Sequence, residues 1–304
     1  MLSLHTNTAS LSTHKALTTS NKALGQTMTK LGTGFRVNSA MDDAAGLQIA
    51  TRLEAQSRGM KVAQRNTQNG ISLLQTGEGA LAEVSSMLLR MKDLATEAAN
   101  GTASHQDRQA LQLEFDELGK EMLNLLGNTT FGGERVFFDP PTLDITTNTN
   151  IYGLGGLLGT GDITFQIGAA TQEQMVINLR DSELGNTRNA ISLTSAAYRL
   201  STNKGDELMT VDKASNSIGL LQAAVDATSA LRSALGASAN RLEHTLSNLR
   251  NITDNTEVAR GRIMDVDYAS ATSEMTKQQM LVQASTALLK QTSQMSQMVA
   301  SLLQ

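Results

Sequence analysis

Residues 31–53 read LGTGFRVNSAMDDAAGLQIATRL, and they separate two apolar patterns of helical spacing in a chain of 304 residues. The earlier pattern ends with three leucines that stand seven residues apart, Leu17, Leu24 and Leu31. The later pattern starts after the segment and continues to about Ala98. Gly32 and Gly34 predict the end of the first helix and a turn, because glycine readily adopts the left-handed backbone found there. The segment is therefore a joint between two helices.

The polar residues of this joint predict how the second helix begins. We expect Asn38 and Ser39 to cap it, because short polar side chains accept hydrogen bonds from the free N–H groups of a first turn. Asp42 and Asp43 fall close to the same N-terminus, where the helix dipole favours carboxylates.

A second polar segment, residues 255–267, occupies the matching place in the C-terminal third of the chain. Both segments carry residues of both signs, so we expect complementary charges to face each other across the two joints. The candidate joint residues are Arg36, Asn38, Asp42, Asp43, Arg262, Asp265 and Asp267, with Arg260 beside them.

The composition favours long helices. Hydrophobic residues make up 40% of the chain, but aromatic residues only 3%, and Trp is absent. Aromatic side chains normally supply the bulk of a large compact core. An apolar set dominated by Ala, Leu, Val, Ile and 14 Met suits narrow seams between helices better. The two prolines are neighbours, Pro140 and Pro141, and do not interrupt the helical patterns on either side. We therefore predict a mainly α protein.

Charge and reactive side chains exclude several classes of function. The net charge of −4 and the 18% of charged residues favour neither nucleic acid nor an anionic membrane as a partner. Cys is absent and the four histidines are isolated in the sequence, so no thiol, metal or cofactor site is expected. No apolar run approaches the ~20 residues that span a bilayer. We expect a protein that is not an enzyme.

The two ends of the chain carry heptad patterns, which need a partner helix. Neither end has enough large apolar residues for a stable isolated helix. We therefore expect them to pair in an inner domain of two terminal helices, residues 1–41 and 258–304, when many copies surround them. The candidate assembly seam consists of Leu17, Leu24, Leu31, Leu281, Leu288, Met295 and Leu302.

A rod domain of residues 42–178 and 205–257 is expected between the two ends. Coiled-coil spacing predicts three helices, which run to about residue 99, over about 105–128 and over about 212–255. Alternating apolar and polar residues predict a β-hairpin region within 131–179, with strands at 162–167 and 174–179.

The remaining segment, residues 179–204, is expected to be a small surface insertion with a short helix around 192–200. The chain has no room for large outer domains. The expected fold is thus mainly α, with long coiled-coil-like helices from both ends and a small β-hairpin region.

Both joints also carry a family resemblance. The first, from Gly34 to Gly46, and the run Arg262-Ile-Met-Asp-Val-Asp-Tyr-Ala269 resemble the two signatures of bacterial flagellins. The resemblance covers roughly residues 1–138 and 204–304. The opening MLSLHTN and the run LGTGFRVNSA are similar to the lateral or secondary flagellin subgroup.

The resemblance implies a structural subunit of the extracellular bacterial flagellar filament. Such subunits leave the cell unfolded through the flagellar type III channel and self-assemble into a hollow helical filament for motility. The implied partners are further copies of the chain, an export chaperone, the cap protein and the hook–filament junction proteins.

The resemblance also implies a candidate patch for the flagellin-sensing Toll-like receptor of vertebrates. Arg90, Leu94 and Glu114 match the family's pattern at this patch, whereas Leu89 stands where a Gln is usual.

Two other functions share part of this pattern with the filament subunit. A hook–filament junction protein shares the terminal helices, but it usually has a less complete rod signature and occurs in few copies. A signalling coiled-coil hairpin would have one central tip and no β segment, which conflicts with the strands predicted at 162–179.

Overall fold

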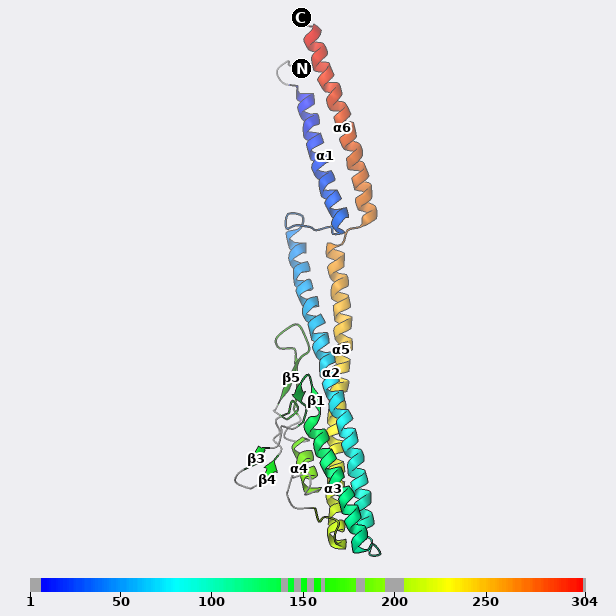
Figure 1. The fold of residues 1–304 in the computed structure, drawn as a ribbon. Coiled ribbons are helices and arrows are strands. Elements are labelled where there is room, and N and C mark those ends of the chain that lie inside the picture. Colours follow the sequence, from blue (N-terminus) through cyan, green and yellow to red (C-terminus); the bar gives the residue numbers. More distant parts are fainter. Residues whose placement is uncertain are drawn as a thin grey trace. The chain divides into compact units, whose positions relative to one another are not determined.

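The computed structural model describes residues 7–137, 142–144, 149–151, 156–159, 162–178, 184–194 and 205–302 (Figure 1). The packing divides the chain into two compact units. The first contains residues 1–57 and 253–304, and the second contains residues 58–252.

The first unit contains two terminal helices that pack side by side, α1 (Thr8–Thr33) and α6 (Tyr268–Leu302). The side chain of Asn7 caps α1 by accepting a hydrogen bond from the Ser10 N–H, at 3.0 Å. Its amide nitrogen also donates to the Thr292 carbonyl oxygen of α6, at 3.4 Å. Gly34 ends α1 in the left-handed conformation, with φ 75°, as its place in the joint predicts.

The α1–α6 contact is lined mostly by small and polar side chains. The buried and half-buried positions recur three and four residues apart on both helices, as in a coiled coil. On α1 they are Thr13, Leu17, Ser20, Leu24, Thr27 and Leu31, and on α6 they are Ala271, Met275, Gln278, Val282, Ser285, Leu289 and Thr292. Such a seam buries little apolar surface, so it stabilises the pair only weakly.

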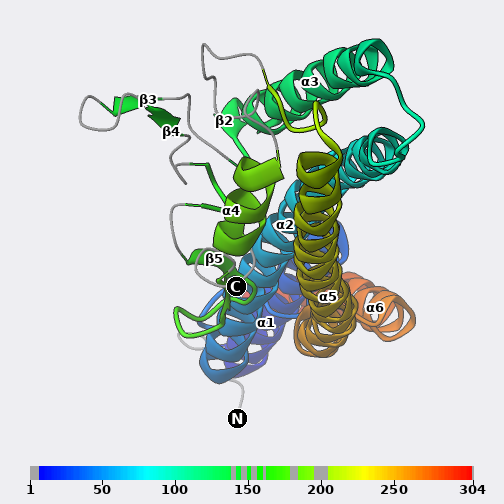
Figure 2. The same cartoon turned by 90° about the horizontal axis from the view of Figure 1, so that it is seen from below.

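The second unit is built on three long helices that share one core (Figures 1 and 2). They are α2 (Ala44–Ala98), α3 (His105–Asn128) and α5 (Val211–Met264), of which α2 and α5 continue into the first unit. The heptad positions that the sequence assigns to α2 are fully or almost fully buried, among them Leu74, Leu81, Val84, Leu88, Met91, Ala95 and Ala98. Phe115, Met122 and Leu126 of α3 and Leu221, Leu231, Leu235 and Leu242 of α5 complete this core.

Local signals explain the ends of α3. Ser104 and Asp107 form a reciprocal capping box at its start, where each side chain accepts a hydrogen bond from the backbone of the other. The helix ends at Asn128, close to the Gly127-Asn128 stop expected from the sequence.

Among the described residues, three small antiparallel hairpins follow α3. Strands β1 (Thr130–Phe131) and β2 (Glu134–Arg135) are joined by Gly132 and Gly133, whose φ values of 63° and 94° suit a tight hairpin turn. Strands β3 (Thr142–Asp144) and β4 (Thr149–Ile151) form the second hairpin.

The third hairpin is the one that the sequence predicts. It pairs β5 (Ile163–Gln166) with β6 (Gln174–Ile177), and Phe165 stands opposite Met175. Met175 and Ile177 are buried while Gln174 and Val176 are exposed, so the predicted alternation is present. The prediction of a mainly α fold with small β-hairpins is confirmed.

Three glycines of α2 lie along one face of the helix, and two of them, Gly59 and Gly70, lie against the β5–β6 hairpin. Gly59, Gly70 and Gly77 are separated by eleven and seven residues, so they lie on one face of the helix. A Cβ atom at Gly59 would stand 2.8 Å from the Ala169 Cβ, and one at Gly70 would stand 2.8 Å from a ring carbon of Phe165. The missing side chains thus let the β5–β6 hairpin approach the helix backbone.

The segment expected to be a surface insertion is partly packed in the core. Helix α4 (Gly185–Thr194) lies upstream of the short helix expected around 192–200, and residues 195–204 fall outside the described residues. Leu184 and Ile191 are buried in the core of the second unit. Residues 184–194 are therefore not a surface loop, and their amphipathic pattern is too short to have revealed this from the sequence.

Candidate functional site

The two joints lie next to each other in the first unit and are connected by backbone hydrogen bonds. The Arg36 N–H donates to the Met264 carbonyl oxygen at 2.6 Å, and the Val266 N–H donates to the Gly34 carbonyl oxygen at 3.0 Å. Phe35 and Asp265 form an isolated antiparallel bridge between these two bonds. The joint is thus a minimal β-ladder set between helices.

Arg36 adds a side-chain contact to this ladder, and its partner on the second joint is a backbone carbonyl and not a charged side chain. The Arg36 guanidinium donates to the Ile263 carbonyl oxygen at 2.6 Å, whereas its distance to the Asp43 carboxylate is 4.0 Å. Arg36 and Asp43 precede α2 on the same side of the joint. Their side chains are 48% and 35% exposed, so the ion pair stabilises the fold by less than about 1 kcal/mol.

The start of α2 corrects the expected cap. The Asp43 carboxylate accepts the Gly46 N–H at 2.8 Å and so caps the helix. The expectation that Asn38 and Ser39 cap α2 is wrong, because their N–H groups donate to the Asp42 carboxylate, both at 3.0 Å. These backbone hydrogen bonds, first that of Asn38 and then that of Ser39, lower the pKa of Asp42.

The second joint places Asp267 at the start of α6. Its carboxylate accepts the Ala269 N–H at 3.0 Å, so Asp267 is the cap of that helix. Arg262 is exposed. Arg260 instead pairs with Glu54 of α2 at 3.4 Å, and both side chains are about one-third exposed. Sequence reasoning missed Glu54, because its partner depends on the register between α2 and α5.

The structure places the two halves of the candidate assembly seam differently. Leu17, Leu24 and Leu31 are half-buried and face α6. On α6, by contrast, Leu281, Leu288 and Met295 are 42%, 53% and 47% exposed, and the side chain of Leu302 lies outside the described residues. The structure therefore does not bring the two predicted stripes together. Met280, 59% exposed, extends the C-terminal one.

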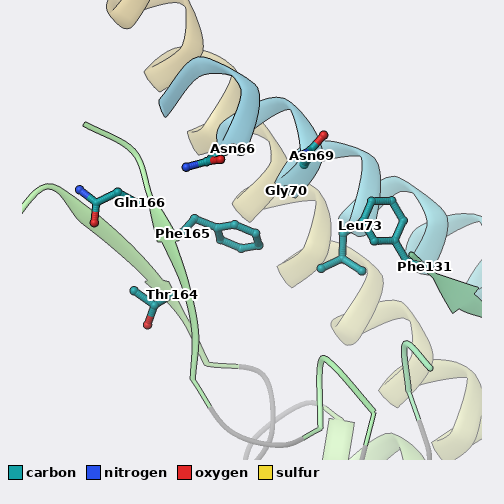
Figure 3. Close-up of a pocket in the computed structure, with 8 residues that line it drawn as sticks. All are labelled: Asn66, Asn69, Gly70, Leu73, Phe131, Thr164, Phe165 and Gln166. Carbon is teal, nitrogen blue, oxygen red and sulfur yellow. The ribbon is translucent and has the colours of Figure 1, made fainter. Parts of the chain in front are cut away.

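A cavity of about 330 Å³ in the second unit lies between α2, strand β1 and strand β5 (Figure 3). Its walls carry the phenyl rings of Phe131 and Phe165, and Gly70 and Leu73 of α2 lie between them. The Gln166 amide donates to the Gly168 and Ala170 carbonyl oxygens, at 3.0 and 2.6 Å, and so holds the hairpin turn. The lining residues include no Asp, Glu, His, Lys or Cys, so the cavity has no general acid or base that could activate the Thr164 hydroxyl.

Two features of the described residues bear on other functions. Within them, no three His, Asp or Glu side chains come together in a group that could hold a metal ion. Of the helices in the described part of the chain, none combines the length and the apolar character needed to span a bilayer.

Comparison with known proteins gives the family. Residues 4–140 match the model of the bacterial flagellin N-terminal helical region, and residues 218–303 match that of the C-terminal helical region. Flagellin A of Vibrio cholerae is 31% identical to the chain, and the alignment covers 100% of both proteins. The chain belongs to the bacterial flagellin family. It is therefore a structural subunit of the flagellar filament and not an enzyme.

Other relatives agree with this assignment. The flagellin of Bacillus subtilis is 36% identical over 98% of both chains. A solved structure described as a flagellar hook-associated protein of Vibrio parahaemolyticus shares the fold, with a TM-score of 0.56. It is 18% identical and covers 74% of this chain and 100% of its own. The hook–filament alternative gains no further support, since this likeness concerns the fold alone.

The candidate receptor patch contains one exposed ion pair. The Arg90 guanidinium of α2 and the Glu114 carboxylate of α3 stand 2.7 Å apart, and their side chains are 54% and 45% exposed. Leu94 is buried, at 1% exposure, and packs in the core of the second unit. Leu89, where the family pattern has a Gln, is 49% exposed.

Proposed function

We propose that this chain is exported unfolded through the flagellar type III channel and self-assembles into a hollow helical filament that serves motility. The observation that carries this proposal is the exposed apolar stripe on α6, made of Leu281, Leu288 and Met295 with Met280 beside it. Apolar residues at heptad spacing on a solvent-facing helix indicate a surface that other helices cover. Further copies of the chain supply such helices.

The weak α1–α6 seam supports the same proposal. Thr27, Gln278 and Ser285 occupy positions where a stable two-helix hairpin would carry larger apolar side chains. Neighbouring subunits would add the apolar contacts that the pair lacks. In this proposal residues 1–41 and 258–304 form the inner domain, and residues 42–178 and 205–257 form the rod domain. The joint then connects them.

The proposal also includes partners outside the filament shaft. An export chaperone, the cap protein and the hook–filament junction proteins would bind the terminal helices before or during assembly. The vertebrate Toll-like receptor would meet the exposed Arg90–Glu114 pair. Leu94 is buried, so it would support the patch without touching the receptor. Leu89 is exposed and stands where the family usually has a Gln, so it would weaken the contact.

A pair of substitutions on α6 tests the assembly surface. Leu288→Asp puts a carboxylate into the exposed apolar stripe, whereas Ser293→Asp puts the same charge on a polar, exposed part of the helix. Burying an unpaired carboxylate between subunits would cost several kcal/mol. We expect Leu288→Asp to abolish filaments in negative-stain micrographs, while Ser293→Asp retains them and both monomers keep the helical circular dichroism of the parent.

Two outcomes would contradict the proposal. Normal filaments from Leu288→Asp would show that the stripe stays in water after assembly. If the parent protein gave only short oligomers and no filaments under any salting-out condition, the hook–filament junction function would be favoured instead.

A further inference from the structure

The chain contains two Asn-Gly sequences in contrasting surroundings, Asn69-Gly70 and Asn100-Gly101. The first lies within α2, and the second lies in the turn between α2 and α3. An asparagine followed by glycine can react with its own backbone, because the next residue has no Cβ to hinder the approach of its nitrogen. The surrounding structure decides whether that approach happens.

The turn brings the reacting groups of Asn100 and Gly101 together. The Asn100 side-chain oxygen accepts the Thr102 N–H at 3.2 Å, so the carboxamide folds back over the intervening Gly101 nitrogen. Both residues are exposed, and apart from Gly101 and its two chain neighbours no residue has an atom within 4 Å of the place where a Gly101 Cβ would be. Among the hydrogen bonds of the described residues, none uses the Gly101 N–H.

We propose that Asn100 is a site of spontaneous deamidation in the folded protein. The Gly101 nitrogen loses its proton to water and attacks the Asn100 Cγ. The Cγ–Nδ2 bond then breaks, the departing nitrogen takes a proton from water and leaves as ammonia, and a five-membered succinimide ring remains in the backbone. Water opens the ring at one of its two carbonyl carbons. Its oxygen becomes part of the new carboxylate and one hydrogen returns to the Gly101 nitrogen, which yields aspartate or isoaspartate.

Asn69 is protected by the same reasoning. Gly70 lies in the interior of α2, where the helix occupies its N–H group in the backbone ladder. The Gly70 position is also crowded, since a Cβ there would stand 2.8 Å from Phe165 and 3.2 Å from Leu242. Ring closure at Asn69 would require local unfolding in the interior of a long helix whose other face packs in the core, which is rare.

Arg108 of α3 gives the reaction a preferred product. Its guanidinium donates to the Asn100 carbonyl oxygen at 3.1 Å and to the Ala98 carbonyl oxygen at 2.9 Å. A donor at the Asn100 backbone carbonyl makes that carbon more electrophilic in the succinimide. Attack by water at this carbon produces isoaspartate, whose free carboxylate then faces the guanidinium. Without this guanidinium, the helix dipole would disfavour a carboxylate so close to the C-terminus of α2.

The test uses the full-length protein, incubated folded and in urea at mildly alkaline pH. Trypsin separates the two sites, because residues 66–90 carry Asn69 and residues 93–108 carry Asn100. We expect the peptide of Asn100 from the folded protein to gain one mass unit on the order of tenfold faster, or more, than that of Asn69. In urea the two rates should become similar. Gly101→Ala should slow conversion in both conditions without changing the melting temperature.

A second measurement tests the role of Arg108. Labelling by an isoaspartyl methyltransferase should show that isoaspartate is the main product in the parent. In Arg108→Gln, isoaspartate should make up a smaller share of the product. Two results would overturn the proposal: an Asn100 peptide that stays unchanged in the folded protein but converts in urea, or equal conversion of both sites in the folded protein. The first would mean that the turn blocks ring closure, and the second that the helix gives no protection.

Discussion

Gly70→Ala tests whether the close approach of the β5–β6 hairpin to α2 depends on a glycine at this position. The new Cβ would stand 2.8 and 2.9 Å from two ring carbons of Phe165 and 3.2 Å from Leu242 Cδ1. These distances are too short for ordinary contact, so the ring must move away from the helix. Overpacking of this kind costs about 1–3 kcal/mol, and the better helix propensity of Ala offsets roughly 1 kcal/mol of it.

Gly79→Ala is the matched control, because Gly79 lies in the same helix with nothing within 4 Å of a Cβ. That variant should gain the helix propensity alone and become about 1 kcal/mol more stable. We therefore expect the unfolding free energies of the two variants to differ by about 1–3 kcal/mol, which is the overpacking cost. Urea titration followed by circular dichroism measures both values.

A double substitution distinguishes crowding from other effects. Phe165→Leu removes ring atoms that the new Cβ would meet, so the combined variant with Gly70→Ala should lose less stability than the two single variants together. Contacting residues typically couple by about 0.5–3 kcal/mol in such a cycle. Equal stabilisation by Gly70→Ala and Gly79→Ala would refute the reasoning and show that the hairpin does not rest on the glycine.

Two further predictions concern the second unit. Ile191→Ala should lower the unfolding free energy by about 2–4 kcal/mol, because Ile191 is fully buried. Leu193 is 55% exposed, so Leu193→Ala should change the unfolding free energy by less than about 0.5 kcal/mol. Similar losses for the two variants in urea titrations would contradict the position of α4. Burial, together with the nearby Glu207 carboxylate, raises the pKa of Asp116, so the folded state holds this proton more tightly and stability should fall as pH rises through the raised pKa. Asp116→Asn should remove this decline in urea midpoints measured across that range, and an unchanged pH profile would argue against it.

The main features of the fold could be predicted because they follow from spacing. The apolar positions of α2 recur every three or four residues over many turns, and Leu74, Leu81 and Leu88 are buried as that pattern requires. The β5–β6 hairpin could be predicted in the same way. Phe165 and Met175 lie in two segments of alternating apolar and polar residues, on either side of a Gly-containing turn.

The surface of α6 was harder to assign because the helix carries two stripes at heptad spacing. Leu281, Leu288 and Met295 form the more apolar stripe, but the small residues of the other stripe, such as Ala271 and Ser285, face α1. Spacing identifies a stripe but does not state which partner covers it. The cap of α2 posed a similar problem, since several adjacent polar residues satisfy the same preference and the backbone selects Asp43.

The backbone ladder of the joint also determines which substitutions this region tolerates. Its two hydrogen bonds use the N–H groups of Arg36 and Val266, so they persist whatever L-amino-acid side chain stands at these positions, with proline as the exception. Alanine at Arg36 or Val266 should therefore leave the connection between the chain's two halves in place, whereas proline at either position should remove one of its two hydrogen bonds. The joint residues that cap helices, Asp43 and Asp267, depend on their side chains instead.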